Sequence, residues 1–250
     1  MKIAANVLVG AGLVLSAQGA GIAFNSSETQ TSLLELYTSE GCSSCPPAEA
    51  SLSRWKSSPR LWKDFVPVAF HVDYWNGLGW RDPWSAKSSS DRQQAYARLW
   101  GSENIYTPEF VLNGREWRDW PGRDVPGVDP SRKPGVLTLS SSDTNTWQVL
   151  FRPTVTGAAT YEAHVVLAQC GVVSAVTAGE NRGRRLLDDF AVTALADVPL
   201  VVNGVAAAGT LTLAAPKRVR GSLAVVVWIT LADRLEPVQA TGGWIRHLDE

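Results

Sequence analysis

Cysteine, methionine and histidine are scarce in this sequence, which has three cysteines, one methionine and three histidines among 250 residues. An excess of one charge is also lacking, because 23 basic residues face 24 acidic residues and the formal net charge is −1. No basic block is present to neutralise phosphates, so we expect no nucleic acid partner. A phosphate-binding loop and a nucleophile elbow are missing too, and only His71 and His164 lie in segments expected to fold. Neither nucleotide-dependent nor Ser-His-Asp chemistry therefore has support.

Apolar residues, in contrast, are plentiful. The sequence is 45% hydrophobic and 19% charged, which is typical of a soluble globular protein with a real core. Its length fits one large domain or two modest ones. The eleven tryptophans are expected mainly in the core or in interfaces, and an aromatic-lined groove is the alternative.

The first twenty residues have the pattern of a secretory signal peptide. A hydrophobic run from Ile3 to Leu15 follows Lys2, and small residues then permit a cut after Ala20 or Ala23. The run is too short to span a bilayer comfortably, although an uncleaved anchor is the alternative. We therefore expect residues 1–20 to be a signal peptide, the mature protein to be secreted or periplasmic, and no other membrane contact. In that oxidising location a disulfide persists.

The organisation of the chain changes near residue 130. The first half predicts strands and helices in alternation, with strands at 33–37, 66–74 and 110–112, a helix beginning at Pro46, a helix over 88–100, and a hairpin turn at 113–114. Residues 121–134 contain four prolines and two glycines, which is typical of a linker. Beyond them nearly every apolar run predicts a strand. We expect an α/β domain over 30–128 and an all-β, sandwich-like domain over 132–250.

Two of the three cysteines, Cys42 and Cys45, lie between the first strand and the first helix. A helix N-terminus favours a thiolate and lowers the pKa of a cysteine placed there. Cys42 would then be an exposed nucleophile, and Cys45, one turn later, would resolve the mixed disulfide. A redox couple, a metal site and an inert structural staple are all compatible with this spacing.

The chain resembles a family of secreted proteins of about this length, catalogued as a domain of unknown function and placed in the thioredoxin-like superfamily. The resemblance rests on ELYTSEGCSSCPPAEA, FHVDYWNGLGWRDPWS, RQQAYA and YTPEFVLNG, with weaker echoes in GENRGR and VQATGGWI. It implies that the α/β domain is thioredoxin-like and is followed by a β domain. It also implies a cis-proline at Pro108, preceded by Thr107, beside the cysteine pair.

Two features depart from ordinary thioredoxins. A gap of 63 residues separates Cys45 from Pro108, so an insertion must be housed near the cysteines, where it could narrow or cover a cleft. Glu40 and Gly41 precede Cys42 where an aromatic residue would be usual, and Glu49 lies one turn beyond Cys45. Because nearby carboxylates disfavour a thiolate, the pair is expected to be a weaker nucleophile, or a disulfide that seldom turns over.

Other residues are candidates for supporting roles. His71 and Asp73 are two apart on a predicted strand and could share one face as a proton relay, although a structural hydrogen bond is the plainer interpretation. Thr107, Trp75 and Trp80 are candidates for a substrate cleft, and the alternative is a loop folded on its own aromatic residues. Cys170 is the odd cysteine and is expected to be buried and free, and pairing with a partner chain is the alternative.

The sequence thus predicts an exported thiol-disulfide oxidoreductase that uses Cys42, Cys45 and Pro108, needs no cofactor, and acts on protein or small-molecule thiols and disulfides. One alternative is a copper protein that binds Cu(I) through Cys42, Cys45 and His71, a soft ligand set similar to that of copper-delivery proteins. The other is a non-enzymatic binding module in which the disulfide is structural.

Overall fold

The computed structural model describes residues 21–246 apart from 144, 158, 215, 217, 218 and 220, so the expected signal peptide at 1–20 lies outside the described residues. The described residues contain two α-helices, α1 (Pro46–Trp55) and α2 (Lys87–Trp100), and a short 3-10 helix, η1 (Asn76–Leu78). The strands are β1 (Ile22–Asn25), β2 (Ser32–Thr38), β3 (Phe65–His71), β4 (Glu109–Leu112), β5 (Arg115–Glu116), β6 (Gly135–Ser141), β7 (Thr146–Pro153), β8 (Tyr161–Cys170), β9 (Val172–Ala175), β10 (Arg185–Asp188), β11 (Ala191–Asn203), β12 (Ala206–Thr212), β13 (Ser222–Leu231) and β14 (Pro237–Arg246).

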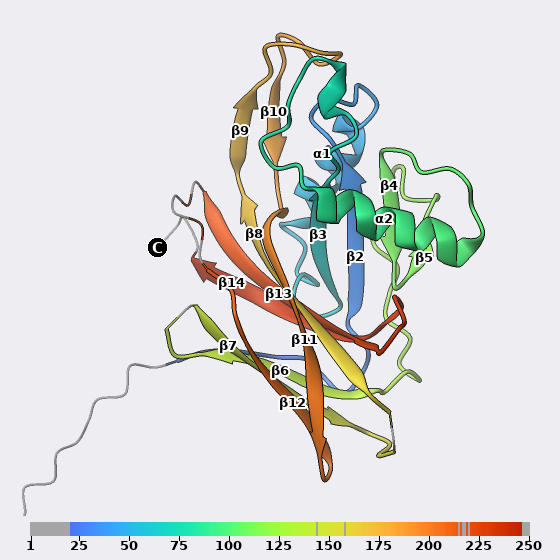
Figure 1. Ribbon diagram of the computed structural model, residues 1–250, viewed down its shortest axis with the longest axis vertical. Helices are drawn as coiled ribbons and strands as arrows, with labels where there is room; N and C mark the ends of the chain where they lie inside the picture. The colour runs from blue at the N-terminus through green and yellow to red at the C-terminus, as the bar shows by residue number, and fades with distance from the viewer. Residues whose placement is uncertain are drawn as a thin grey trace, which may run out of the picture.

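Twelve of these strands form one mixed sheet (Figure 1). Its main path runs β1-β6-β7-β12-β11-β3-β2-β4-β5, while β8 pairs with β11 and β13, and β13 pairs with β14. The long strand β11 joins the two halves of the chain, because it starts beside β3 in a parallel pair, continues beside β8 and ends beside β12. The remaining two strands, β9 and β10, pair with each other as a separate hairpin.

The expected fold class is wrong. Instead of a thioredoxin-like α/β domain followed by an all-β sandwich, the described residues are mostly strand, with two α-helices, and one large mixed sheet takes strands from both halves. Local patterns miss this because the pairing of β3 with β11 connects Ala69 with Ala191, far apart in the chain. The division of the chain into two domains near residue 130 stays a prediction. Within the expected linker, residues 121–134, Val125 is buried and its carbonyl oxygen accepts a hydrogen bond from Arg60.

The local elements around the cysteines are confirmed. The run 33–37 lies in β2, all of whose residues are buried, because β3 and β4 flank this strand on its two edges. Helix α1 begins at Pro46 and buries Ala48, Leu52 and Trp55, the residues that recur at helical spacing. Helix α2 ends at Trp100, and its C-cap Gly101 adopts a positive φ of 67°. Strand β4 is joined to β5 through the predicted turn at 113–114.

Candidate functional site

Cys42 and Cys45 form a disulfide bond in the loop between β2 and α1. Cys45 is the N-cap of α1, and the first two residues of the helix are the prolines of the Cys-Ser-Ser-Cys-Pro-Pro run. Prolines have no amide proton, and the next two amides, of Ala48 and Glu49, donate to the Cys45 carbonyl oxygen at 2.9 and 3.2 Å. This helix end therefore keeps its dipole but has few free amide donors for a thiolate.

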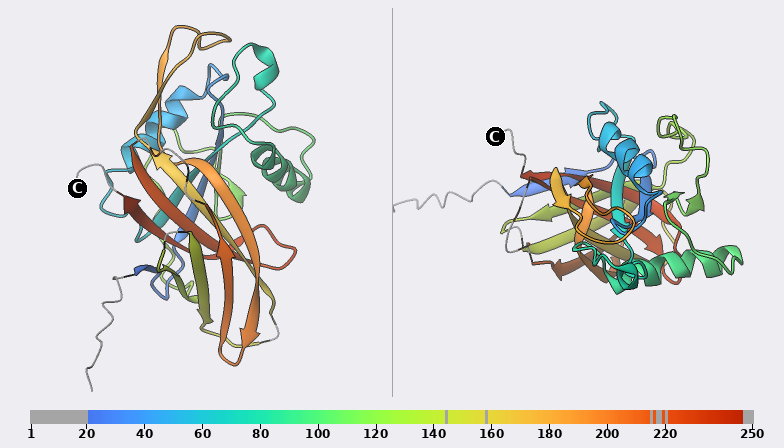
Figure 2. Two further views of the ribbon diagram at one scale, coloured as in Figure 1. Left: turned by 60° about the vertical axis from the view of Figure 1, so that its left-hand side comes forward. Right: turned by 90° about the horizontal axis from the view of Figure 1, so that it is seen from above.

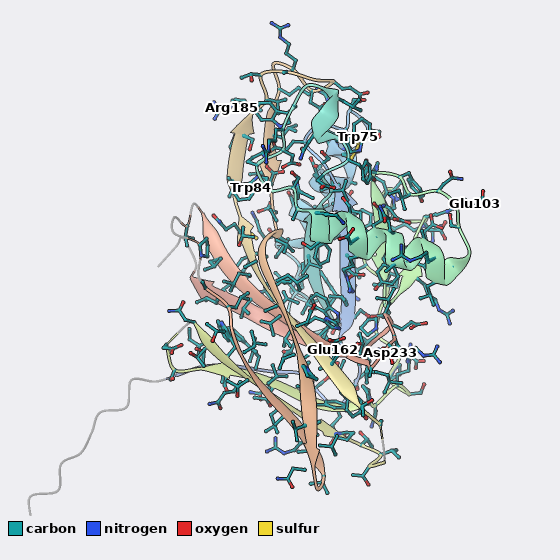
Figure 3. The ribbon with its side chains drawn as sticks, in the orientation of Figure 1. Trp75, Trp84, Glu103, Glu162, Arg185 and Asp233 are labelled. Carbon is teal, nitrogen blue, oxygen red and sulfur yellow. A yellow bond between two sulfur atoms is a disulfide. The ribbon has the colours of Figure 1, made fainter. Side chains whose placement is uncertain are left out.

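The Thr107–Pro108 peptide bond is cis and lies against the disulfide. The carbonyl oxygen of Thr107 is 3.7 Å from Cys42 Sγ, and the Ser44 hydroxyl, 3.3 Å from the same sulfur, donates to that carbonyl at 3.4 Å. Trp75 Nε1 donates to Thr107 Oγ1 at 2.8 Å. Figure 3 shows Trp75 at the end of the molecule that carries α1. The expected cleft residues Thr107 and Trp75 thus lie with the cysteine pair.

His71 ends β3 with both side-chain nitrogens facing carboxyl groups. Its Nδ1 is 2.8 Å from Asp82 Oδ2, and its Nε2 is 3.9 Å from Asp188 Oδ1. Burial alone would lower the pKa of His71, but the charge and hydrogen bond of Asp82, with the charges of Asp188 and Glu49, raise it to about 10. His71 is therefore a buried cation at neutral pH.

Asp73 does not pair with His71. Because β3 ends at His71, the alternation of side chains along a strand does not extend to Asp73. The Asp73 carboxylate instead accepts a hydrogen bond from Ser90 Oγ at 2.5 Å, at the start of α2. The partner that the sequence did not reveal, Asp82, comes from the loop before α2, and its Oδ2 also accepts the Glu40 amide at 2.8 Å.

Three further carboxyl groups are buried near His71, those of Glu40, Glu49 and Asp188. Burial raises the pKa of Glu49 to about 7, although the His71 charge and a 2.7 Å hydrogen bond from Thr38 oppose the shift. Burial and the nearby acids also raise the pKa of Asp188. No N–H or O–H donor among the described residues bonds to either Asp188 oxygen, and its carboxyl group contacts that of Glu40. We call His71, Asp82, Glu40, Glu49 and Asp188 the acid cluster.

Residues 72–86, between β3 and α2, form a loop rich in tryptophan that contributes to the same region, and we call it the aromatic loop. Trp80 Nε1 donates to Glu40 Oε2 at 2.7 Å, so this expected cleft residue holds one carboxylate of the acid cluster. Trp84 is partly buried and lies three residues before the start of α2. Together with residues of β11 it lines a cavity of about 620 Å³.

Cys42 was expected to be exposed, and this expectation is wrong. Both Cys42 and Cys45 are 0% exposed. The β9–β10 hairpin, which comes about 130 residues later in the chain, bonds to the loop that carries them. Asn181 at its tip is 1% exposed, and its Nδ2 donates to the carbonyl oxygens of Glu40 and Cys42, both at 2.9 Å. Glu180 accepts the Ser43 amide at 3.0 Å. Only the weak GENRGR motif at 179–184 pointed to these residues.

Cys170 and Arg184 both have structural partners. Cys170 is free and buried; burial raises its pKa, and its sulfur accepts the Phe190 amide at 3.1 Å. Arg184 donates to Asn181 Oδ1 at 2.9 Å.

No group of three or more His, Cys, Asp or Glu side chains placed to hold a metal ion occurs in the described part of the chain. Within that part, no helix is long and apolar enough to cross a membrane.

Fold and site together define a mostly β protein with a buried Cys-x-x-Cys disulfide at the start of a helix. The chain belongs to the family described as "Protein of unknown function (DUF1223)", whose model matches residues 33–230. A crystal structure of a protein from Agrobacterium tumefaciens is similar, with a TM-score of 0.59 and 23% identity over 87% of this chain and 95% of that one. HBP35 of Porphyromonas gingivalis is also similar, with a TM-score of 0.55 and 11% identity over 87% of this chain and 76% of that one. These likenesses concern the fold alone, and no curated protein matches the sequence.

Proposed function

We propose that the chain exchanges disulfides with thiols through Cys42 and Cys45. The observation that carries the proposal is the position of the Cys42 sulfur, 3.7 Å from the Thr107 carbonyl oxygen and 3.3 Å from the Ser44 hydroxyl. A purely structural staple gains little from such a place, because it closes a loop of only a few residues, and the stabilisation from cross-linking grows with loop length.

The exchange begins when a substrate thiolate attacks Cys42 Sγ. The Cys42–Cys45 bond breaks, Cys45 leaves as a thiolate and takes up a proton, and a mixed disulfide joins the substrate to Cys42. A second substrate thiolate then attacks the substrate sulfur and releases Cys42, which is also protonated. Two electrons pass from the substrate dithiol to the protein pair, and the product is a substrate disulfide. The reverse sequence reduces a substrate disulfide.

We assign the proton exchange to Glu49 rather than to His71 and Asp73. His71 has a pKa of about 10 and keeps its proton throughout the neutral range. Glu49 lies one turn after Cys45 in α1, is buried, and has a pKa of about 7, so it both binds and releases a proton near neutrality. Glu49→Gln is then expected to flatten the pH profile of exchange around neutrality, and the exposed Glu103→Gln is the matched control.

We further propose that the protein is exported and works in an oxidising compartment. The signal-like pattern of residues 1–20 and the disulfide support this. We also propose that the chain resembles the thioredoxin-like superfamily at this site and in the chemistry of the site. The basis is that the cysteine pair lies beside Thr107 and Pro108.

The direct test is exchange with a disulfide-bonded peptide, followed by mass spectrometry of trapped mixed disulfides. Cys45→Ala should accumulate an adduct on Cys42, and Cys42→Ala should abolish exchange. Cys170→Ala is the matched control, because Cys170 is buried, has a raised pKa and forms no disulfide. Exchange that persists at wild-type rate in Cys42→Ala would overturn the proposal.

The same preparations separate the alternatives. Stoichiometric Cu(I) binding by the reduced protein, lost in His71→Ala, would favour the copper protein. A structural disulfide would show neither exchange nor copper binding. We expect exchange without His71-dependent copper binding, because both His71 nitrogens face carboxyl groups.

A further inference from the structure

The β9–β10 hairpin is built as an arm on the main sheet. Among the described residues, strands β9 and β10 pair with no strand but each other, and the arm includes the connecting residues 176–184. It joins β8 through Gly171 and β11 through Phe190, and both residues have positive φ, 75° and 58°. The sheet ladder is therefore interrupted on both sides at the base of the arm. Figures 1 and 2 show the arm projecting at the same end of the molecule as α1.

The tip of the arm is fastened to the cysteine loop through main-chain groups. Asn181 donates to two carbonyl oxygens, of Glu40 and Cys42, and Glu180 accepts the Ser43 amide. Arg184 in turn holds Asn181 Oδ1 at 2.9 Å, which fixes the orientation of the amide group.

The tip also meets the aromatic loop without intervening side chains. Gly179 adopts a φ of 72°, and a Cβ atom built on it would lie 3.2 Å from the Cβ of Trp80. A Cβ on Gly79 would lie 3.3 Å from the Gly179 nitrogen. The two glycines thus allow the backbones of the arm and the loop to approach each other closely.

We propose that the β9–β10 arm is a latched cover that controls access to the Cys42–Cys45 disulfide, with Asn181 as its latch. The proposal rests on the proposed function, since it concerns the same sulfurs. Both cysteines are 0% exposed and Asn181 of the tip bonds to the Cys42 carbonyl oxygen, so on this proposal a thiol reaches Cys42 after the tip has moved. The base stays fixed meanwhile, because Asp189 Oδ1 accepts both the Gly171 amide at 2.8 Å and Lys56 Nζ at 2.6 Å.

Release of the tip also indicates the class of substrate. It frees the Ser43 amide, and it frees one acceptor position on each of the Glu40 and Cys42 carbonyl oxygens, the second of which also accepts the Cys45 amide at 3.3 Å. Such main-chain donors and acceptors match an extended polypeptide, whose backbone offers the same groups in alternation. The arm therefore occupies hydrogen-bonding groups that a peptide substrate would use, and we assign the substrate to polypeptides that carry a thiol or a disulfide.

The test is the rate at which dithiothreitol reduces the disulfide of the folded protein, followed by rapid alkylation and mass spectrometry. Asn181→Ala removes both hydrogen bonds from the tip to the Glu40 and Cys42 carbonyl oxygens and should raise the rate about 10- to 30-fold. Glu180→Ala removes one exposed hydrogen bond and should raise it about 2- to 5-fold. Arg182→Ala, at an exposed neighbouring position of the tip, is the matched control and should leave the rate unchanged. Amide hydrogen exchange in 171–190 should quicken in the same order.

The outcomes are distinct. If Asn181→Ala and Glu180→Ala are both reduced at the wild-type rate, or if the wild-type disulfide reacts as fast as in urea-unfolded protein, the arm is not a cover. If Asn181→Ala unfolds, Glu180→Ala and the comparison with unfolded protein still decide the question. If the variants are reduced faster but no form exchanges with a disulfide-bonded peptide, the cover stands while the oxidoreductase proposal fails. Faster reduction with faster peptide exchange supports both the cover and the substrate class.

Discussion

His71 and Asp82 form an ion pair in the interior, with Nδ1 2.8 Å from Oδ2 and side chains 1% and 0% exposed. The pair joins the end of β3 to the loop before α2, next to the cysteine loop, because Asp82 also accepts the Glu40 amide. The position of the loop that carries Trp75 and Trp80 therefore depends on a charge interaction inside the protein.

His71→Gln should lower the free energy of unfolding by about 3–5 kcal/mol, because it leaves the Asp82 charge buried without a cation. Equilibrium unfolding in urea at pH 7 measures this. His164→Gln is the matched control: its partner Asp197 is 49% exposed, so water compensates that charge and a loss of about 1 kcal/mol is expected. Equal losses in the two variants would show that the buried His71–Asp82 pair contributes no more to the free energy of unfolding than the partly exposed His164–Asp197 pair.

Stability should fall as pH rises from about 4.5 to about 10. Glu49 has a pKa raised from 4.5 to about 7, so the folded state binds more protons than the unfolded state in that window, and raising the pH favours unfolding. His71, with a pKa raised from 6.5 to about 10, contributes stability that is complete below pH 6.5 and is lost toward pH 10. Thermal unfolding across this range measures the trend.

Glu49→Gln isolates one part of that dependence. It should remove about 2–3 kcal/mol of the change between pH 4.5 and 7 and leave the decline at higher pH in place. Glu109→Gln is the reference for a second buried carboxyl group. Burial raises the pKa of Glu109 to about 7 as well, but this residue lies in β4. A stability profile of Glu49→Gln that is parallel to wild type throughout would contradict the assignment.

Lys56 and Asp189 connect the end of α1 to the base of the arm at 2.6 Å. Lys56→Met should cost about 2 kcal/mol, because the Asp189 side chain is 0% exposed and would keep an uncompensated charge. Lys87→Met removes an i,i+4 pair whose side chains are 78% and 52% exposed, and should cost less than about 0.5 kcal/mol. Similar losses in the two variants would argue against a fixed base for the arm.

The segments next to the cysteines were predictable from the sequence because local interactions determine them. Proline at the first helical position, apolar residues at helical spacing in α1, and the Asn-Gly turn after β4 each act over a few residues. The large sheet was not predictable, because its key pairing brings β11 beside β3 from far along the chain.

The candidate site divides in the same way. The cysteine pair, Thr107 and Trp75 stood out by motif and do lie together. Asp82, Asp188 and Asn181 come from three loops or strand ends, and only folding brings them to His71 and Cys42. The burial of the cysteines was not predictable either, because the arm that bonds to their loop comes from far along the chain and its two short strands gave no sign of this contact.

The central claim is that Cys42 and Cys45 interconvert between disulfide and dithiol in the folded protein, and a redox titration against glutathione or dithiothreitol buffers tests it most directly. The scarcity of free amide donors at the start of α1 and the nearby acid cluster disfavour a thiolate, so the disulfide form should be relatively stable. We predict a reversible two-electron transition closer to about −270 mV than to about −120 mV, the reducing and oxidising ends for exchange proteins. A pair that shows no reversible transition above about −300 mV, or that is reduced only when the chain unfolds, would contradict the account.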